Sequence, residues 1–138
     1  MRHGAIGGTN MNAMNDNNAV IVGLCAGRHS LPVSDYVFDT EVNPVDLTAM
    51  RRVAVRKLEA LFDGRFESRM VNAGGMGDEV MYVTTTPLVV YATGLTAALL
   101  TVINVAVEMG VYDITVMHFD RDTCGYYPQR ISTGISLC

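Results

Sequence analysis

The segment LVVYATGLTAALLTVINVAVEMG, residues 88–110, decides the fold class. It opens with apolar and β-branched residues, which predict a buried strand over Leu88–Ala92. A Thr93-Gly94 turn follows, and Leu95–Met109 has the length and composition of a helix that a glycine ends. A strand that runs through a glycine turn into a long helix is typical of a parallel crossover, so we expect an α/β fold.

The predicted helix is apolar around most of its circumference. Beyond the first turn only Thr101, Asn104 and Glu108 are polar, at spacings of three and four residues. A helix of this kind is buried on most sides, and a chain of 138 residues has little interior to hide it. We therefore expect it to pack against a sheet and a second subunit, which makes the protein a homo-oligomer.

The rest of the chain predicts a second helix and further strands. Short apolar or alternating runs between turn residues predict strands at residues 19–26, 65–72, 79–86, 114–119 and 126–131. Residues 35–40 indicate either a short edge strand or an irregular turn. Pro128 places the last strand at a sheet edge. The expected architecture is a mixed β-sheet packed by two helices, in the order β-α-β-β-β-α-β-β.

The second helix is expected between Asn43 and Gly64. Asn43 suits the N-cap position, Pro44 suits the first helical position, and glycine ends the helix. Its apolar face is formed by Leu47, Met50, Ala54, Leu58 and Leu61. Its outer face carries Arg51, Arg52, Arg56 and Lys57. That face is either solvated or, through Arg52 and Arg56, a second anion-binding surface.

Composition excludes several functional classes. Hydrophobic residues make up 49% and charged residues 17% of the chain, which excludes disorder in its body. No stretch of about 18 apolar residues is present, so no membrane span is expected. The net charge of −4 argues against binding to duplex nucleic acid. Three cysteines without a CxxC pair indicate neither a disulfide framework nor a zinc site, and they favour the cytoplasm.

The N-terminal residues differ from the rest of the chain. Residues 1–18 are rich in Gly, Asn and Met and lack the apolar core of a signal peptide. We expect a flexible leader there, ahead of a single ligand-binding domain at residues 19–138. Met1, Met11 or Met14 is the native start.

Catalytic signatures are missing from the sequence. It contains no GxxxxGK[ST], GxGxxG, HExxH or GxSxG motif. His3, His29 and His118 lie far apart, and no cysteine is spaced to pair with them. We therefore expect a protein that is not an enzyme and that needs neither a cofactor nor a metal.

Several residues suit a phosphorylated ligand. Arg28 and Arg121 each follow a core strand, so both side chains can meet at one rim and hold a diphosphate. The Thr93-Gly94 turn precedes a helix N-terminus, whose unpaired N–H groups can bind phosphate, and the glycine lets a ligand approach closely. Gly94 is equally explained by the tight turn alone. Asn104 either makes a structural hydrogen bond or reads a base or ribose. Tyrosines near this rim offer a surface for stacking on a purine: Tyr91, Tyr126 and Tyr127.

Two segments, YATGLTAALLTVINVAVEMGVYDITVMHFDRDTCGYYPQRI (91–131) and VIVGLCAGRHSLPVSDYVF (20–38), resemble small phage proteins of the Thoeris anti-defence sponge type. The resemblance implies a compact α/β dimer or hexamer in the host cytosol. It implies sequestration, without cleavage, of cyclic ADP-ribose isomers made by bacterial immune TIR enzymes, and in some members of cyclic oligonucleotides. Carried over, the ligand contacts are Arg28, Asn104 and Arg121, with Tyr91 or Tyr82 stacking on the adenine.

Three functions remain open at this point. The first is non-catalytic binding of a cyclic nucleotide immune signal, which blocks anti-phage defence. The second is a Rossmann-like ring nuclease or hydrolase that acts on cyclic nucleotides through His29 or His118. The third is a structural oligomer whose apolar helix serves only as an interface.

Overall fold

The computed structural model describes residues 18–27, 30–40, 42–72, 74 and 77–137. The expected leader, residues 1–18, lies outside these ranges except for Asn18. The described chain has the element order β-β-α-β-β-β-α-β-β-β. The elements are β1 (Val20–Cys25), β2 (Tyr36–Phe38), α2 (Leu47–Leu61), β3 (Glu67–Asn72), β4 (Asp78–Val83), β5 (Leu88–Tyr91), α3 (Thr96–Met109), β6 (Ile114–Asp120), β7 (Gly125–Ile131) and β8 (Ser136–Leu137).

Five strands form a mixed sheet in the order β2-β1-β5-β6-β7. The pairs β2–β1, β1–β5 and β5–β6 are parallel, and β7 runs antiparallel to β6. The chain passes from β5 to β6 through α3, which confirms the parallel crossover. β7 is an edge strand, as Pro128 predicts. This pairing brings the carboxyl ends of β1, β5 and β6 to the same edge of the sheet.

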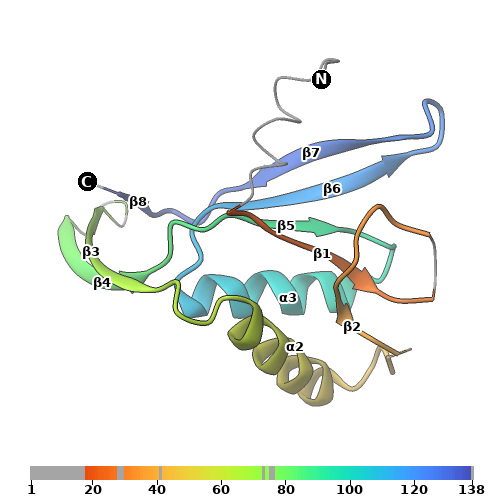
Figure 1. Cartoon of the computed structure of the whole chain (residues 1–138), viewed down its shortest axis with the longest axis horizontal. Helices are drawn as coiled ribbons and strands as arrows, with labels where there is room; N and C mark the ends of the chain where they lie inside the picture. Colours follow the sequence, from red (N-terminus) through yellow and green to blue (C-terminus); the bar gives the residue numbers. More distant parts are fainter. Residues whose placement is uncertain (1–17, 28–29, 41, 73, 75–76, 138) are drawn as a thin grey trace.

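Both helices cover one face of this sheet (Figure 1). The side chains that pack between helices and sheet are fully buried and apolar, among them Val22, Leu24, Ala54, Leu58, Leu88, Val90, Val102 and Ala106. An ion pair between Arg51 and Glu108 joins the exposed sides of α2 and α3. The α/β class, the mixed sheet and the two helices therefore agree with the sequence prediction. Neither helix of the described ranges is long and apolar enough to cross a membrane.

Helix α2 begins later than the sequence suggests. Its N-cap is Asp46, whose side chain accepts a hydrogen bond from the Ala49 N–H at 3.0 Å. Asn43 instead accepts from the Val45 N–H at 3.2 Å, in the turn before the helix. Leu47, the first helical residue, is 58% exposed and does not join the buried face. Both Asn43 and Asp46 are good N-caps, and the sequence alone does not separate them.

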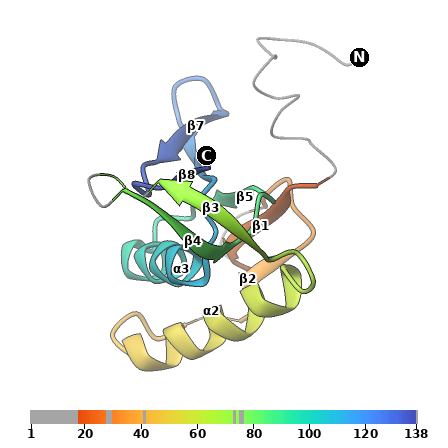
Figure 2. The same ribbon diagram turned by 90° about the vertical axis from the view of Figure 1, so that its left-hand side faces the viewer.

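A second sheet, which the sequence did not predict, stands at one end of the molecule (Figure 2). It is antiparallel, with the order β4-β3-β8. β8 is only two residues long, too short to show any periodicity in the sequence. The segment after β4 returns to the main sheet layer through Thr84, whose N–H donates to the carbonyl of Gly110 at 3.1 Å.

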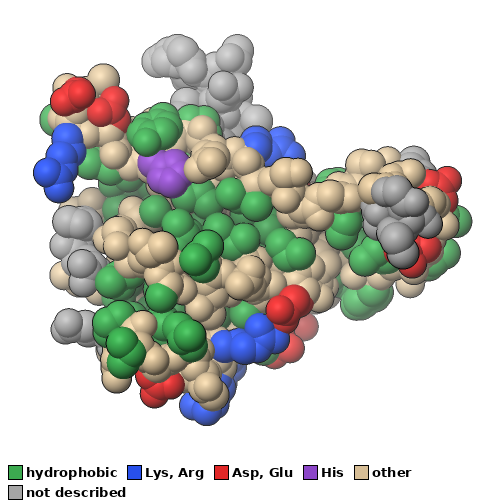
Figure 3. Space-filling model, turned by 180° about the vertical axis from the view of Figure 1, so that it is seen from behind, with side chains coloured by type: hydrophobic (Ala, Val, Ile, Leu, Met, Phe, Trp, Pro, Cys, Tyr) green, Lys and Arg blue, Asp and Glu red, His purple; other side chains and the backbone are tan. Residues whose placement is uncertain are grey.

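Helix α3 leaves part of its apolar surface uncovered. Its buried residues are Ala98, Val102, Val105 and Ala106. Leu100 is 54% exposed, and Asn104, one turn later on the same side, is also exposed. Asn104 thus lies on the side of α3 that the sheet leaves open, together with Glu108 of the same polar stripe. Figure 3 shows hydrophobic side chains gathered on the face of the molecule that includes α3.

Candidate functional site

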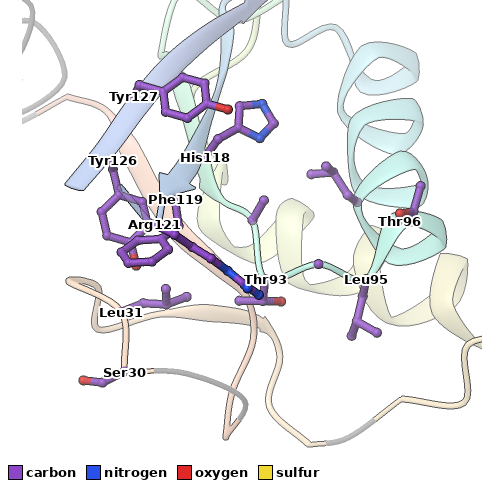
Figure 4. A pocket seen from close by; sticks show the side chains of 13 residues that line it. Ser30, Leu31, Thr93, Leu95, Thr96, His118, Phe119, Arg121, Tyr126 and Tyr127 are labelled. Carbon is purple, nitrogen blue, oxygen red and sulfur yellow. The ribbon is translucent and has the colours of Figure 1, made fainter. Parts of the chain in front are cut away.

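A cavity of about 700 Å³ opens at the carboxyl ends of β1, β5 and β6 (Figure 4). Its volume lies within the usual range for small-molecule sites. It is lined by residues from the loop after β1, the β5–α3 junction and the β6–β7 hairpin: Ser30, Leu31, Ala92, Thr93, Gly94, Leu95, Thr96, Leu99, His118, Phe119, Arg121, Tyr126 and Tyr127. Among the described residues that line it, none is acidic.

The β5–α3 junction forms the floor of the cavity. Gly94 has a φ of +87°, and a Cβ added there would meet no atom within 4 Å, so the space above it is open. The first intrahelical hydrogen bond runs from the Leu99 N–H to the Leu95 carbonyl. The N–H groups of the residues that open α3 therefore have no acceptor within the helix. Leu95 is the N-cap residue, and no side chain makes a capping hydrogen bond at this end of α3.

Arg121 stands in the turn between β6 and β7. Asp120 shapes this turn, because its carboxylate accepts from the Asp122 N–H and from the Thr123 hydroxyl, each at 3.0 Å. Asp120 is thus occupied with the turn, and no carboxylate in the described chain forms an ion pair with Arg121. In Figure 4 the Arg121 guanidinium points toward Thr93. The cavity therefore has an unpaired cation on one side and a helix N-terminus on the other.

Aromatic side chains of the hairpin form two walls of the cavity. His118 and Tyr127 face each other across the strands, with ring centroids 5.3 Å apart. Phe119 and Tyr126 form a second pair, with centroids 5.4 Å apart. The first wall lies on the side of α3 and the second near Leu31 (Figure 4). Exposed aromatic rings beside a cation suit a ligand with a flat base.

Tyr91 supports one of these walls without lining the cavity. Its ring meets that of Tyr126 edge to face, with centroids 5.0 Å apart. Burial of its hydroxyl, and to a smaller extent the neighbouring Tyr126, raises the pKa of Tyr91 above its usual 10.0. Tyr91 is therefore neutral at physiological pH and orients Tyr126. Tyr126, rather than Tyr91, presents its ring to the cavity.

The structure brings only part of the predicted site together. Thr93, Gly94 and Arg121 line one cavity, as their positions after core strands predict. Arg28 lies outside the described residues. Asn104 is exposed on α3 and Tyr82 is 65% exposed on β4, where it stacks on Phe66; neither lines the cavity.

The proposed second anion surface is separate from this cavity. Arg52 and Arg56 lie one turn apart on the exposed side of α2. No residue of α2 lines the cavity. In the described part of the chain, no three His, Cys, Asp or Glu side chains lie close enough together to hold a metal ion.

Comparisons with known proteins do not identify the chain. It matches no protein-family model, no curated protein and no solved structure significantly. Its function therefore has to be inferred from the cavity itself.

Proposed function

We propose that the protein binds a cyclic nucleotide signal in this cavity and holds it chemically unchanged. One observation carries the proposal: Arg121, the N-terminus of α3 and the hairpin aromatics line the same cavity. A cation and free N–H groups suit phosphate, and aromatic rings suit a base. The resemblance to sponge proteins narrows the ligand to cyclic ADP-ribose isomers, with cyclic oligonucleotides as further candidates. Such a protein acts in the cytosol, by sequestering the signal that activates anti-phage defence.

The surroundings of His118 favour binding without cleavage. Its Nε2 lies 2.8 Å from the Gln129 Oε1, and a carboxamide does not exchange protons as a carboxylate does. Hydrolysis by acid and base needs a second titratable group in reach of the ligand. The described residues that line the cavity supply His118 and two tyrosines besides Arg121, and no carboxylate. His29, the other histidine considered for acid–base catalysis, lies outside the described residues.

The ligand should be released intact. Stoichiometric protein is held for hours with cyclic ADP-ribose isomers or cyclic dinucleotides, denatured by heat, and the supernatant is chromatographed. We expect calorimetric binding of at least one of these compounds and its full recovery. Absence of binding to all of them would refute the proposed ligand class.

A hydrolase is the second candidate, because His118 lines the same cavity as Arg121. In that case the same supernatant contains linear or mononucleotide products. His118→Ala should then abolish the products while the ligand still binds. Gln129→Ala is a matched control, since it removes the hydrogen-bond partner of the histidine but leaves the ring in place.

The proposal includes self-association through α3. Most residues of α3 are apolar, and Leu100 among them is 54% exposed. Asn104 lies beside Leu100 on the same face of the helix. We expect sedimentation velocity at micromolar concentration to show a species larger than the 15.0 kDa monomer. Leu100→Glu should shift the protein to monomer, whereas Val80→Glu, a similarly exposed position on β4, should not. A wild-type protein that sediments only as a monomer would contradict this.

A further inference from the structure

Thr93 contains the one buried polar side-chain atom in the described chain that has no hydrogen-bond partner. The residue is 5% exposed and lines the cavity. Thr84 provides a contrast, because it is fully buried but its hydroxyl accepts from the Thr86 N–H at 3.1 Å. Buried hydroxyls are nearly always paired, since leaving one unpaired costs free energy. An unpaired hydroxyl at the wall of a cavity indicates a partner that arrives with the ligand.

The groups around Thr93 all favour an anion as that partner. Thr93 stands three residues before the first residue of α3, where N–H groups and the positive end of the helix dipole are free. The guanidinium of Arg121 points toward it (Figure 4). Gly94, between Thr93 and the helix, leaves open space where any other residue would place a Cβ. Two sources of positive potential, the N-terminus of α3 and Arg121, therefore converge on a place that a bulky group can approach.

We propose that the start of α3 is the phosphate subsite of the cavity, with the Thr93 hydroxyl donating to a phosphate oxygen and Arg121 closing over it. This rests on the proposed function and adds that the ligand is held through a phosphate or diphosphate group at this end. The Thr93 oxygen is out of contact with solvent in the free protein. Because the hydroxyl has no hydrogen-bond partner there, turning it toward a bound phosphate would break no existing hydrogen bond.

The substitution Thr93→Val tests whether the Thr93 hydroxyl binds phosphate or instead stabilises the fold. Valine has the shape of threonine and removes the unpaired hydroxyl, so the free protein should melt about 3 °C higher. The same change should weaken binding of inorganic pyrophosphate about tenfold, which is the loss expected for a hydrogen bond to a charged group. Thr84→Val is the matched control: it should lower the melting temperature and leave pyrophosphate affinity unchanged. Thr93→Ser keeps the donor and should bind like the wild type.

The probe is inorganic pyrophosphate, titrated at constant ionic strength and followed by ¹⁵N NMR. We expect the amide signals of Gly94 and of residues 96–98 to shift. The amide signals of α2 residues should shift less. The subsite is refuted if those amides do not move, or if Thr93→Val destabilises the free protein as Thr84→Val does. If Thr93→Val fails to fold, unchanged affinity in Thr93→Ala gives the same refutation.

The two proposals fail in different ways. Pyrophosphate binding at α3 without binding of any cyclic nucleotide refutes the proposed function and leaves the phosphate subsite standing. Equal affinity of wild type and Thr93→Val for a cyclic ADP-ribose isomer refutes the subsite and leaves the function standing.

Discussion

Arg121→Ala should reduce the affinity for a cyclic ADP-ribose isomer by roughly 10- to 100-fold, which corresponds to losing about 1.5–3 kcal/mol for a charge-assisted hydrogen bond. The side chain is exposed at a hairpin tip and makes no ion pair with the described residues, so its removal should leave the fold intact. Arg121→Lys should restore little affinity, because an ammonium lacks the planar fork that binds two phosphate oxygens.

Calorimetry measures this effect, and Arg130→Ala is its control. Arg130 lies on β7 of the same hairpin, pairs with Asp113 at 3.4 Å and does not line the cavity. Both variants lose one positive charge, so a general effect of net charge would weaken both equally. Unchanged affinity in Arg121→Ala, with circular dichroism like that of the wild type, would exclude Arg121 from the site.

Gly110→Ala should lower the free energy of unfolding by more than about 2 kcal/mol, since positive φ and overpacking each cost roughly 1–3 kcal/mol. Gly110 ends α3 with a φ of +107°. A Cβ there would lie 2.4 Å from the backbone oxygen of Tyr82, which cannot rotate away as a side chain would. The change also disturbs the hydrogen bond from the Thr84 N–H to the Gly110 carbonyl.

Gly94→Ala is the control for Gly110→Ala, and chemical denaturation measures the free energy of unfolding of both variants. Gly94 has a φ of +87°, but a Cβ there meets no atom within 4 Å. It should therefore cost only the strain of the left-handed backbone, about 1 kcal/mol. Similar losses of stability in Gly110→Ala and Gly94→Ala would contradict the prediction. They would show that the backbone near Tyr82 shifts enough to accommodate the added methyl group.

The positions of the strands and helices could largely be predicted from the sequence, because periodicity and glycine turns are local signals. The parallel crossover around α3 follows from Leu88–Tyr91 and the glycine at each end of the helix. The second sheet could not be predicted, since pairing between β3 and β8 joins residues far apart in the chain and β8 has only two residues. Asp46 replaces Asn43 as N-cap for a similar reason: both are adequate locally, and tertiary packing decides between them.

The candidate site was predictable where it depends on strand ends. Arg121, Thr93 and Gly94 meet because the carboxyl ends of parallel strands share an edge. The polar stripe of Thr101, Asn104 and Glu108 indicated the open side of α3, but not that this side faces away from the cavity. The unpaired hydroxyl of Thr93 has no sequence signal either, since pairing depends on atoms that surround it only in the folded chain.

The pairing of β1 on both of its edges also has a kinetic consequence. Its first partner, β2, begins about ten residues after β1 ends. Its other edge pairs with β5, where Val20 meets Leu88 about 70 residues later. At roughly 5–20 residues per second, that edge stays unpaired for several seconds during synthesis. The β3–β4 hairpin lies between β1 and β5 in the chain and closes earlier, because its two strands are adjacent. We therefore expect closure of the long β1–β5 loop to be slow, and the nascent chain exposes an apolar strand edge until it occurs.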